Sequence, residues 1–198
     1  MITDRNRLAR LATILSVVVM TAGCDQISKA AARSLLSQGH PIKFLRGTLE
    51  FTLSQNVGAF LSMGSRLSTP LRYGLFSIGG GLIILAGLYY LVTRTQLSNR
   101  LVIALSLLIG GAIGNLIDRL AFHGSVTDFI FLSIGPLHTG IFNLADMAVM
   151  FGAFYYWFES GRGPNPPLKS DPACIAFRSL SSFRFLGFVH RLGAGGAG

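Results

Sequence analysis

The sequence predicts an α-helical integral membrane protein with four transmembrane helices and a small extracytoplasmic β-sheet between the first and second helices. Its 198 residues are 51% hydrophobic and only 13% charged, whereas a soluble domain has about 25% charged residues. Nearly uncharged segments occupy 73–93, 101–117 and 141–158, and each approaches the roughly 17 to 25 apolar residues that a span needs. Backbone groups find no partners in lipid, so these segments are expected to be helical.

The first predicted span, 11–23, is shorter than the other three. It can cross a membrane if the Arg10 side chain extends its charge to the interface and the helix continues at the other end. That continuation must include Asp25 and Lys29, two charged residues directly after the apolar run. We therefore expect one long helix that carries charged side chains near its outer end.

A competing interpretation treats the same region as a secretory signal peptide. Arg5, Arg7 and Arg10 precede the apolar run, and Cys24 follows it as a possible lipidation site. Cleavage before Cys24 would still leave three spans, and Thr21 stands where a lipidation signal normally has a bulky aliphatic residue. We therefore predict that the helix is not cleaved.

The distribution of basic residues predicts the orientation. Ten of the 17 Lys and Arg residues lie in the two terminal segments and the connection between spans 2 and 3. The positive-inside tendency places these parts in the cytoplasm. The net charge of +9 then reflects membrane topology and attraction to anionic phospholipids, not nucleic-acid binding. Cys24 and Cys174 are expected on opposite faces, and the four histidines lack metal-ligand spacing, so no disulfide, metal or cofactor is predicted.

The segment between spans 1 and 2 is predicted to hold the sheet, within about 40–66. In GTLEFTLSQN, Leu49, Phe51 and Leu53 alternate with polar residues, which is typical of a half-buried strand. The preceding PIKFL is expected to pair with it. The connection between spans 3 and 4, 123–140, lies on the same side and contains Asp128.

The chain is predicted to have one membrane domain, 1–160, followed by a basic cytoplasmic tail, 161–198. The tail opens with GRGPNPPLKSDPA, which is rich in proline and glycine and cannot continue a span. We expect it to be disordered, with an amphipathic segment at the membrane surface as the alternative.

The third span ends in GGAIGNLIDRL, which brings Asn115, Asp118 and Arg119 toward one face. Gly110 and Gly114 form a pair of small residues that permits close helix packing. The polar group has two possible functions, a structural knot at the outer end of the span or direct participation in catalysis.

The fourth span begins FNLADMAVMFGA, where Asn143 and Asp146 share a face and no basic residue of the span neutralises the acid. Such an aspartate is protonated or faces a wet cavity. Asp128 precedes it by eighteen residues in SVTDFIFL. Two carboxylates brought together would share a proton, so that one acts as base on a water and the other as acid. Each aspartate alone is better explained as a helix cap or as the partner in an interhelical hydrogen bond, but together they predict aspartic-protease chemistry.

Five short blocks carry a family resemblance: DQISK, NVGAF, GNLIDR, VTDF and FNLAD, in this order between the spans. They resemble the signature blocks of lipoprotein signal peptidase, also called signal peptidase II or prolipoprotein signal peptidase, over about residues 8–158. The resemblance implies a bacterial inner-membrane aspartic protease with four spans and its active site toward the periplasmic face. Such an enzyme removes the signal peptide of lipid-modified prolipoproteins just before the diacylglyceryl-modified cysteine. It contacts membrane phospholipids and binds globomycin-type inhibitors.

Matched by motif, the resemblance implies that Asp128 and Asp146 are the catalytic pair. Five further residues correspond to positions along the substrate groove: Asn56, Gly58, Asn115, Arg119 and Asn143. A structural or orienting role is implied for Asp25, Lys29 and Asp118. The chain departs from the pattern at Ser28, where Thr is commoner, in NVGAFL, which lacks the usual second Ala, and in its tail.

Two other functions compete with this one. A Ser/Lys membrane peptidase would use Ser28 and Lys29, although neighbouring residues on a helix do not face each other. A small non-enzymatic transporter would use Asp118 and Asp146 as a proton path. Acids gathered at the outer end of the spans fit a surface-facing active site better than a midplane channel.

Overall fold

The computed structural model describes residues 4–36, 40–58 and 64–160. It divides the chain into two compact units, Met1–Trp157 and Phe158–Gly198. The predicted tail, 161–198, lies outside the described residues. The following description concerns the first unit and the last turn of its final helix.

The first helix, α1 (Asp4–Leu35), confirms that the helix continues beyond its apolar run. It passes through the exposed Cys24 and includes Asp25 and Lys29 without a break. The Arg10 guanidinium, which the sequence predicts to reach the interface, has partners of its own near the same end of the molecule. It donates to the carbonyl oxygens of Leu91 at 2.9 Å and Arg94 at 2.7 Å, where the next long helix ends.

The second helical stretch consists of α2 (Thr69–Arg72), a π-helical segment η3 (Tyr73–Gly79) and α3 (Gly80–Thr93). The next helix, α4 (Asn99–Ala121), begins at Ser98, whose hydroxyl accepts from the Leu101 N–H. By length and composition, three helices could cross a membrane: Asn6–Leu35, Thr69–Thr93 and Asn99–Ala121. The last helix, α5 (Leu144–Ser160), has 17 residues, which is at the lower end of the roughly 17 to 25 that a span needs.

The sheet contains more strands than the sequence predicted. The predicted pairing is confirmed, since β1 (Ile42–Phe44) runs antiparallel to β2 (Leu49–Asn56), with a short 3₁₀ turn, η1 (Leu45–Gly47), between them. The sheet continues, however, with β3 (Val126–Ile134) and β4 (Leu137–His138) in the order β1-β2-β3-β4. The sheet predicted within about 40–66 is therefore only half of the sheet, because the 123–140 segment supplies β3 and β4.

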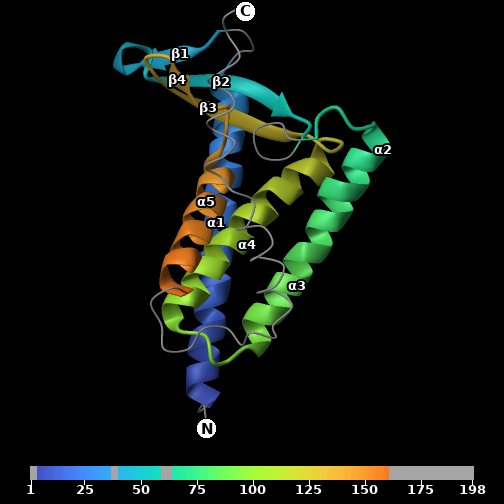
Figure 1. Ribbon diagram of the computed structural model, residues 1–198, viewed down its shortest axis with the longest axis vertical. Helices are drawn as coiled ribbons and strands as arrows, with labels where there is room; N and C mark the ends of the chain where they lie inside the picture. The colour runs from blue at the N-terminus through green and yellow to red at the C-terminus, as the bar shows by residue number, and fades with distance from the viewer. Residues whose placement is uncertain (1–3, 37–39, 59–63, 161–198) are drawn as a thin grey trace, which may run out of the picture. The chain divides into compact units, whose positions relative to one another are not determined.

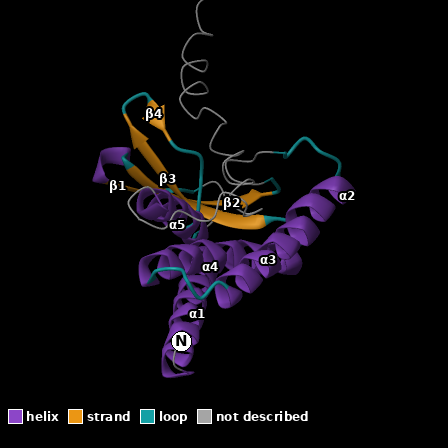
Figure 2. Cartoon of the chain, turned by 60° about the horizontal axis from the view of Figure 1, so that its bottom comes forward, coloured by secondary structure: helices purple, strands orange, loops and turns teal. Residues whose placement is uncertain are grey.

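The helices of the first unit run beside one another, and the sheet crosses the end where α1 finishes (Figures 1 and 2). One apolar core joins α1, α3 and α4 through the buried side chains of Ile14, Ile84 and Ile109. A second core lies under the sheet, where Ala32 and Phe129 contact the half-buried side chains of β2. The arrangement brings β2, β3 and the beginning of α5 together over the C-terminal ends of α1 and α4.

Close packing of α4 confirms the role predicted for its glycines. A Cβ at Gly110 would lie 2.8 Å from the Thr21 Cβ, and one at Gly114 would lie 2.5 Å from the Asp25 Oδ2. Gly111 has the same function toward α5, since its Cβ would meet the Ala145 carbonyl oxygen at 2.5 Å. These glycines let three helices approach closely enough for their polar side chains to meet.

Candidate active site

The beginning of α5 is fixed by a reciprocal cap that involves Asp146. The Asn143 Oδ1 accepts from the Asp146 N–H at 3.0 Å, and the Asp146 Oδ2 accepts from the Asn143 N–H at 3.3 Å. This is the geometry of a capping box, in which the two residues satisfy each other's free backbone donors. The cap holds the Asp146 carboxylate at the first turn of α5, and it uses only one of its oxygens.

The other oxygen of Asp146 contacts α4. Asn115 donates from Nδ2 to the Asp146 Oδ1 at 2.9 Å. The sequence suggested either a helix cap or a residue at a wet cavity, and the structure combines both. Asp146 caps its own helix and also lines a cavity.

Asp128 is the third residue of β3 and is only 2% exposed. Its carboxylate accepts from the Asn143 Nδ2 at 2.7 Å and from the Asn56 Nδ2 at 3.0 Å. Burial, with the negative charge of Asp146 as the second cause, raises the pKa of Asp128 from 3.8 to about 7, although the two amide hydrogen bonds oppose the rise. Asp128 is therefore set to exchange a proton near neutral pH.

The two carboxylates line one cavity of about 400 Å³. Its polar wall also includes Asn56, Asn115 and Arg119, whereas its remaining lining is almost entirely apolar. The apolar side chains come from η3, α3, α4, β3 and α5: Phe76, Ile83, Ile84, Ala112, Leu116, Val126, Val149, Met150 and Ala153. Among the described residues that line it, Arg119 is the one cation.

Arg119 links this cavity to the loop after β2. It donates to the Gly58 carbonyl oxygen at 2.9 Å, and its guanidinium lies 5.8 Å from the centre of the Phe76 ring. Gly58 in turn donates its N–H to the Asn56 Oδ1 at 2.9 Å. Residues 59–63, which include the end of the NVGAF block, lie outside the described residues.

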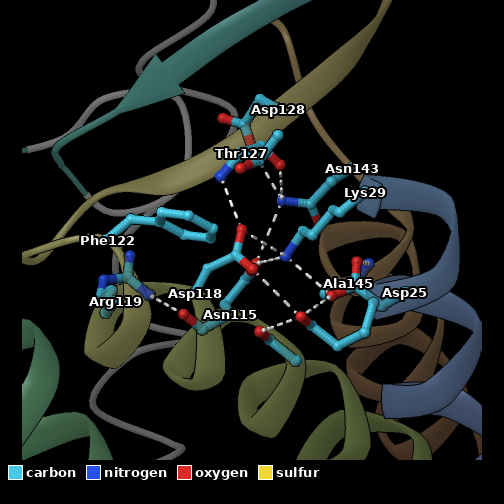
Figure 3. Close-up of polar contacts among 12 residues, drawn as sticks. Asp25, Lys29, Asn115, Asp118, Arg119, Phe122, Thr127, Asp128, Asn143 and Ala145 are labelled. Atoms are coloured by element: carbon cyan, nitrogen blue, oxygen red, sulfur yellow. Dashed lines mark hydrogen bonds and ion pairs between the residues drawn. The ribbon is translucent and has the colours of Figure 1, made fainter. Parts of the chain in front are cut away.

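A second polar cluster, which we call the buried charge network, consists of Asp25, Lys29, Arg33 and Asp118 (Figure 3). The Lys29 Nζ lies 2.8 Å from the Asp25 Oδ2 and 3.5 Å from the Asp118 Oδ2, and all three side chains are 0% exposed. Arg33 approaches the other Asp118 oxygen at 3.8 Å. Two acids and two cations balance, as burial of charge requires.

The buried charge network also fixes the elements around it. The Asp25 Oδ1 accepts from the Ala145 N–H at 2.9 Å, which ties α1 to the first turn of α5. The Asp118 Oδ2 accepts from the Thr127 N–H at 2.8 Å, which ties α4 to the residue before Asp128. Both ties end one residue away from a cavity-lining acid.

Comparison with known proteins identifies the family. A family model described as "Signal peptidase (SPase) II" matches residues 17–161. The chain belongs to the signal peptidase II family. It is 38% identical over 156 residues to the lipoprotein signal peptidase of Coxiella burnetii (strain RSA 493 / Nine Mile phase I), which covers 78% of this chain and 91% of that protein. The corresponding protein of Mycobacterium tuberculosis (strain ATCC 25618 / H37Rv) is 33% identical over 149 residues, 73% of this chain and 68% of that one.

Solved structures agree with this assignment. One, described as a bacterial membrane enzyme structure obtained by the in meso method at 2.3 Å resolution, has a TM-score of 0.66 and 27% identity. It covers 78% of this chain and 93% of its own. A second such enzyme, at 1.9 Å, gives a TM-score of 0.65 and 29% identity. The signal peptidase II chain is thus a helical membrane-type peptidase with three apolar candidate spans and a small antiparallel sheet.

Within this signal peptidase II fold, the predicted site residues occupy two neighbouring clusters. Asn56, Asn115, Arg119, Asp128 and Asp146 line the cavity. Asn143 lies fully buried behind the two acids, and Gly58 supports Arg119 through its carbonyl oxygen. The predicted grouping of Asn115, Asp118 and Arg119 is divided by the structure, since Asp118 turns into the buried charge network and Arg119 into the cavity.

Three residues that contact the buried charge network were not predicted from the sequence: Gln26, Arg33 and Thr127. Arg33 donates to the Thr127 Oγ1 at 2.9 Å, and Gln26 donates to the Asp118 Oδ1 at 3.2 Å. The position of Arg33 could have been predicted, because Asp25, Lys29 and Arg33 are spaced by four residues and therefore lie on one face of a helix. The contacts of Thr127 could not have been predicted, since they depend on how β3 meets α4. The described residues contain no group of three or more His, Cys, Asp or Glu that could hold a metal.

Proposed function

We propose that this chain is a membrane-embedded aspartic endopeptidase that removes signal peptides from prolipoproteins immediately before the diacylglyceryl-modified cysteine. One observation carries the proposal: Asp128 and Asp146 come from different elements, line one cavity, and each receives a side-chain amide donor. The family assignment supports the peptidase class, and the lipoprotein signal peptidases among its relatives support the choice of substrate.

In this mechanism the two acids share one proton. Burial and the charge of Asp146 raise the pKa of Asp128 to about 7, so Asp128 can hold the proton near neutral pH. The ionised Asp146 removes a proton from water as the water oxygen attacks the scissile carbonyl carbon, and Asp128 protonates the carbonyl oxygen. Asp146 then passes its proton to the leaving nitrogen, Asp128 recovers one from a hydroxyl of the intermediate, and the C–N bond breaks.

The other cavity residues are proposed to bind and orient the substrate. Asn56, Asn115 and Arg119 offer hydrogen-bond donors beside the acids, and Gly58 and Asn143 hold these groups in place. The apolar walls suit a signal peptide that reaches the site from the membrane. Asp25, Lys29 and Asp118 support the site from the buried charge network.

We also propose the membrane arrangement. Four spans, with α5 as the fourth, place both termini in the cytoplasm and the sheet and active site on the periplasmic face of a bacterial inner membrane. Figure 1 shows the sheet at the C-terminal end of α1, away from the N-terminus, and the Asp25 carboxylate in the second half of α1 accepts from the Ala145 N–H, next to Asp146; both support this arrangement. We assign the peptidase to residues 1–160, which agrees with a family match that ends at residue 161.

The test is cleavage of a lipid-modified prolipoprotein by the full chain in detergent or lipid. We expect a product that begins at the lipid-modified cysteine, loss of cleavage with globomycin, and no cleavage of the unmodified precursor. Asp128→Asn and Asp146→Asn should be inactive. Glu50→Gln is the matched control, because Glu50 pairs with Lys43 at 3.5 Å on β2, outside the cavity. Cleavage by either Asp variant at the normal rate would refute the mechanism.

The Ser/Lys alternative is disfavoured by the contacts of its two residues. The Ser28 hydroxyl donates to the Asp25 carbonyl oxygen of its own helix at 2.8 Å, and Lys29 is held by two buried acids. Family membership favours a peptidase over a transporter.

A further inference from the structure

Two asparagine side chains lie between Lys29 and the two cavity acids. The Lys29 Nζ donates to the Asn115 Oδ1 at 2.9 Å, and the Asn115 Nδ2 donates to the Asp146 Oδ1 at 2.9 Å. The Asn143 Nδ2 donates to the same Asn115 oxygen at 3.1 Å and to the Asp128 Oδ1 at 2.7 Å. One buried ammonium therefore connects through a single amide to Asp146. Through that amide and a second one it connects to Asp128, and Figure 3 shows Lys29, Asn115, Asn143 and Asp128 along this path.

The chemistry of these groups allows only one orientation of the Asn115 amide. Lysine offers donors only, so the side of the amide that faces Lys29 must be its oxygen. The NH₂ group then points toward Asp146, which as a carboxylate offers acceptors only. A flipped amide would set its NH₂ against the ammonium and its oxygen against the carboxylate, and would lose both hydrogen bonds.

The contact with Asn115 is not needed to neutralise Lys29. Asp25 and Asp118 already supply the opposite charge, at 2.8 and 3.5 Å. A purely structural ion pair would be complete with these two partners. The third ammonium proton instead reaches an amide that touches the catalytic machinery.

We propose that Lys29 is a positioning residue of the peptidase, which acts through Asn115 and Asn143 to aim one amide donor at each catalytic acid and to make loss of a proton from the pair easier. This inference rests on the function proposed above. It assigns to Lys29 an effect on the reacting groups, beyond the support of the fold.

The effect on protonation has a definite sign. The cations nearest the acid pair are Lys29 from α1, which reaches it through Asn115, and Arg119 from α4, which lines the cavity. Asp25 and Arg33 from α1 and Asp118 from α4 belong to the adjoining buried charge network. From β2 comes the uncharged Asn56, and from η3 and α3 come apolar side chains. Burial and the charge of Asp146 raise the pKa of Asp128 to about 7, and the positive charge of Lys29 opposes that rise. Removal of Lys29 should therefore raise the pKa further, and Asp128 should keep its proton to higher pH.

The experiment compares Asp25→Asn with the double variant Asp25→Asn/Lys29→Met. The double variant removes one negative and one positive charge, and the amide oxygen that replaces the carboxylate at position 25 can still accept from the Ala145 N–H. The single variant is its matched control, because it loses the same acid but keeps Lys29. At matched membrane levels we expect kcat of the double variant to fall about 10- to 100-fold below that of the single variant, with KM nearly unchanged. The alkaline limb of its pH profile should lie at higher pH than that of the single variant.

A second arm tests the amide directly. Asn115→Asp keeps an oxygen for Lys29 and removes the donor to Asp146, so we expect a folded protein with a kcat about 100-fold lower. Normal kcat in this variant would overturn the inference, as would coincident pH profiles of the single and double variants. Asp128→Asn is assayed alongside them. If Asp128→Asn cleaves normally, the proposed function itself fails, whereas an inactive Asp128→Asn with an unaffected double variant refutes only the role of Lys29.

Discussion

Two pairs of aspartates lie at the same end of this membrane protein, and they differ in their partners. Asp25 and Asp118 are matched by Lys29 and Arg33, so the buried charge network is neutral and fully paired. Asp128 and Asp146 are held by asparagine amides and, within the described part of the chain, form no ion pair.

The difference in partners explains how aspartates at one end of the molecule can have two functions, one structural and one catalytic. A carboxylate paired with a buried cation fixes the position of its neighbours. A carboxylate held by neutral amides next to a second acid can gain or lose a proton, which catalysis requires. The neighbouring groups therefore distinguish the structural acids from the reactive ones. Substitutions in the structural pair should mainly lower stability, and substitutions in the reactive pair should mainly lower turnover.

The largest expected effect is on turnover. Asp128→Asn and Asp146→Asn should each lower kcat by several orders of magnitude, because removal of one member of a cooperating pair disables the unit. Asp118→Asn should instead lower the amount of folded protein, and its loss of turnover per folded molecule should be smaller. Rates normalised to correctly folded enzyme, by size-exclusion profile and membrane level, make the comparison. Equal losses of normalised kcat in all three variants would show that Asp118 is as important for turnover as Asp128 and Asp146, and would contradict the division into structural and reactive pairs.

The next effect is on stability. Lys29→Met leaves Asp25 and Asp118 buried without their shared cation, and loss of one partner of a buried ion pair destabilises a protein by about 3–5 kcal/mol. The measurement is unfolding in mixed micelles at increasing denaturing detergent. Asp25→Asn/Lys29→Met should recover part of the loss, since it restores the balance of charge. An unchanged midpoint for Lys29→Met would show that the buried charge network does not stabilise the fold.

A smaller effect concerns pH. The pKa of Asp128 is raised from 3.8 to about 7, so the folded protein holds this proton more tightly than the unfolded chain does. Between these pH values the stability that the bound proton contributes is lost as pH rises. kcat/KM should also decline above pH of about 7, where Asp128 loses the proton that it donates.

Asp128→Asn serves as the control for the stability slope, because it has no proton to lose at this position. Its free energy of unfolding should depend less on pH between about 4 and 7 than that of the unmodified protein. Parallel slopes for the two proteins would show that Asp128 is not the titrating group.

Several features were accessible from the sequence because they depend on local pattern. Apolar length predicted the helices, and alternation around Phe51 predicted the pairing of β1 with β2. β3 was missed because its first four residues are all buried, between the helices and the rest of the sheet, so the pattern of period two disappears. The sequence of a strand that is buried on both faces cannot be distinguished by its periodicity from a short piece of an apolar helix.

The candidate site was predictable by residue but not by contact. The five blocks named both cavity acids, yet nothing in the sequence shows that Asp118 contacts Lys29 while its neighbour Arg119 enters the cavity. That division depends on how α1 and α4 approach each other. The partners of Arg10 are backbone carbonyl oxygens, which every residue carries, so the sequence could not predict them.

The smallest expected effect comes from a glycine-to-alanine substitution, made once beside the buried charge network and once in the wall of the cavity. Gly114 lies on the side of the buried charge network, where a new Cβ would be 2.5 Å from the Asp25 Oδ2. Asp25 cannot move away easily, because Lys29 and the Ala145 N–H hold its two oxygens. Gly114→Ala should therefore lower the free energy of unfolding by about 1–3 kcal/mol.

Gly80 is the matched position on the cavity side. It lines the cavity in a helical conformation, with φ −58° and ψ −44°, and a Cβ there would meet nothing within 4 Å. Gly80→Ala should raise the free energy of unfolding by about 0.4–1 kcal/mol, because alanine has less freedom to lose on folding. The same detergent unfolding series measures both variants. A destabilised Gly80→Ala with a neutral Gly114→Ala would reverse the comparison, and would mean that the cavity side is the tightly packed one.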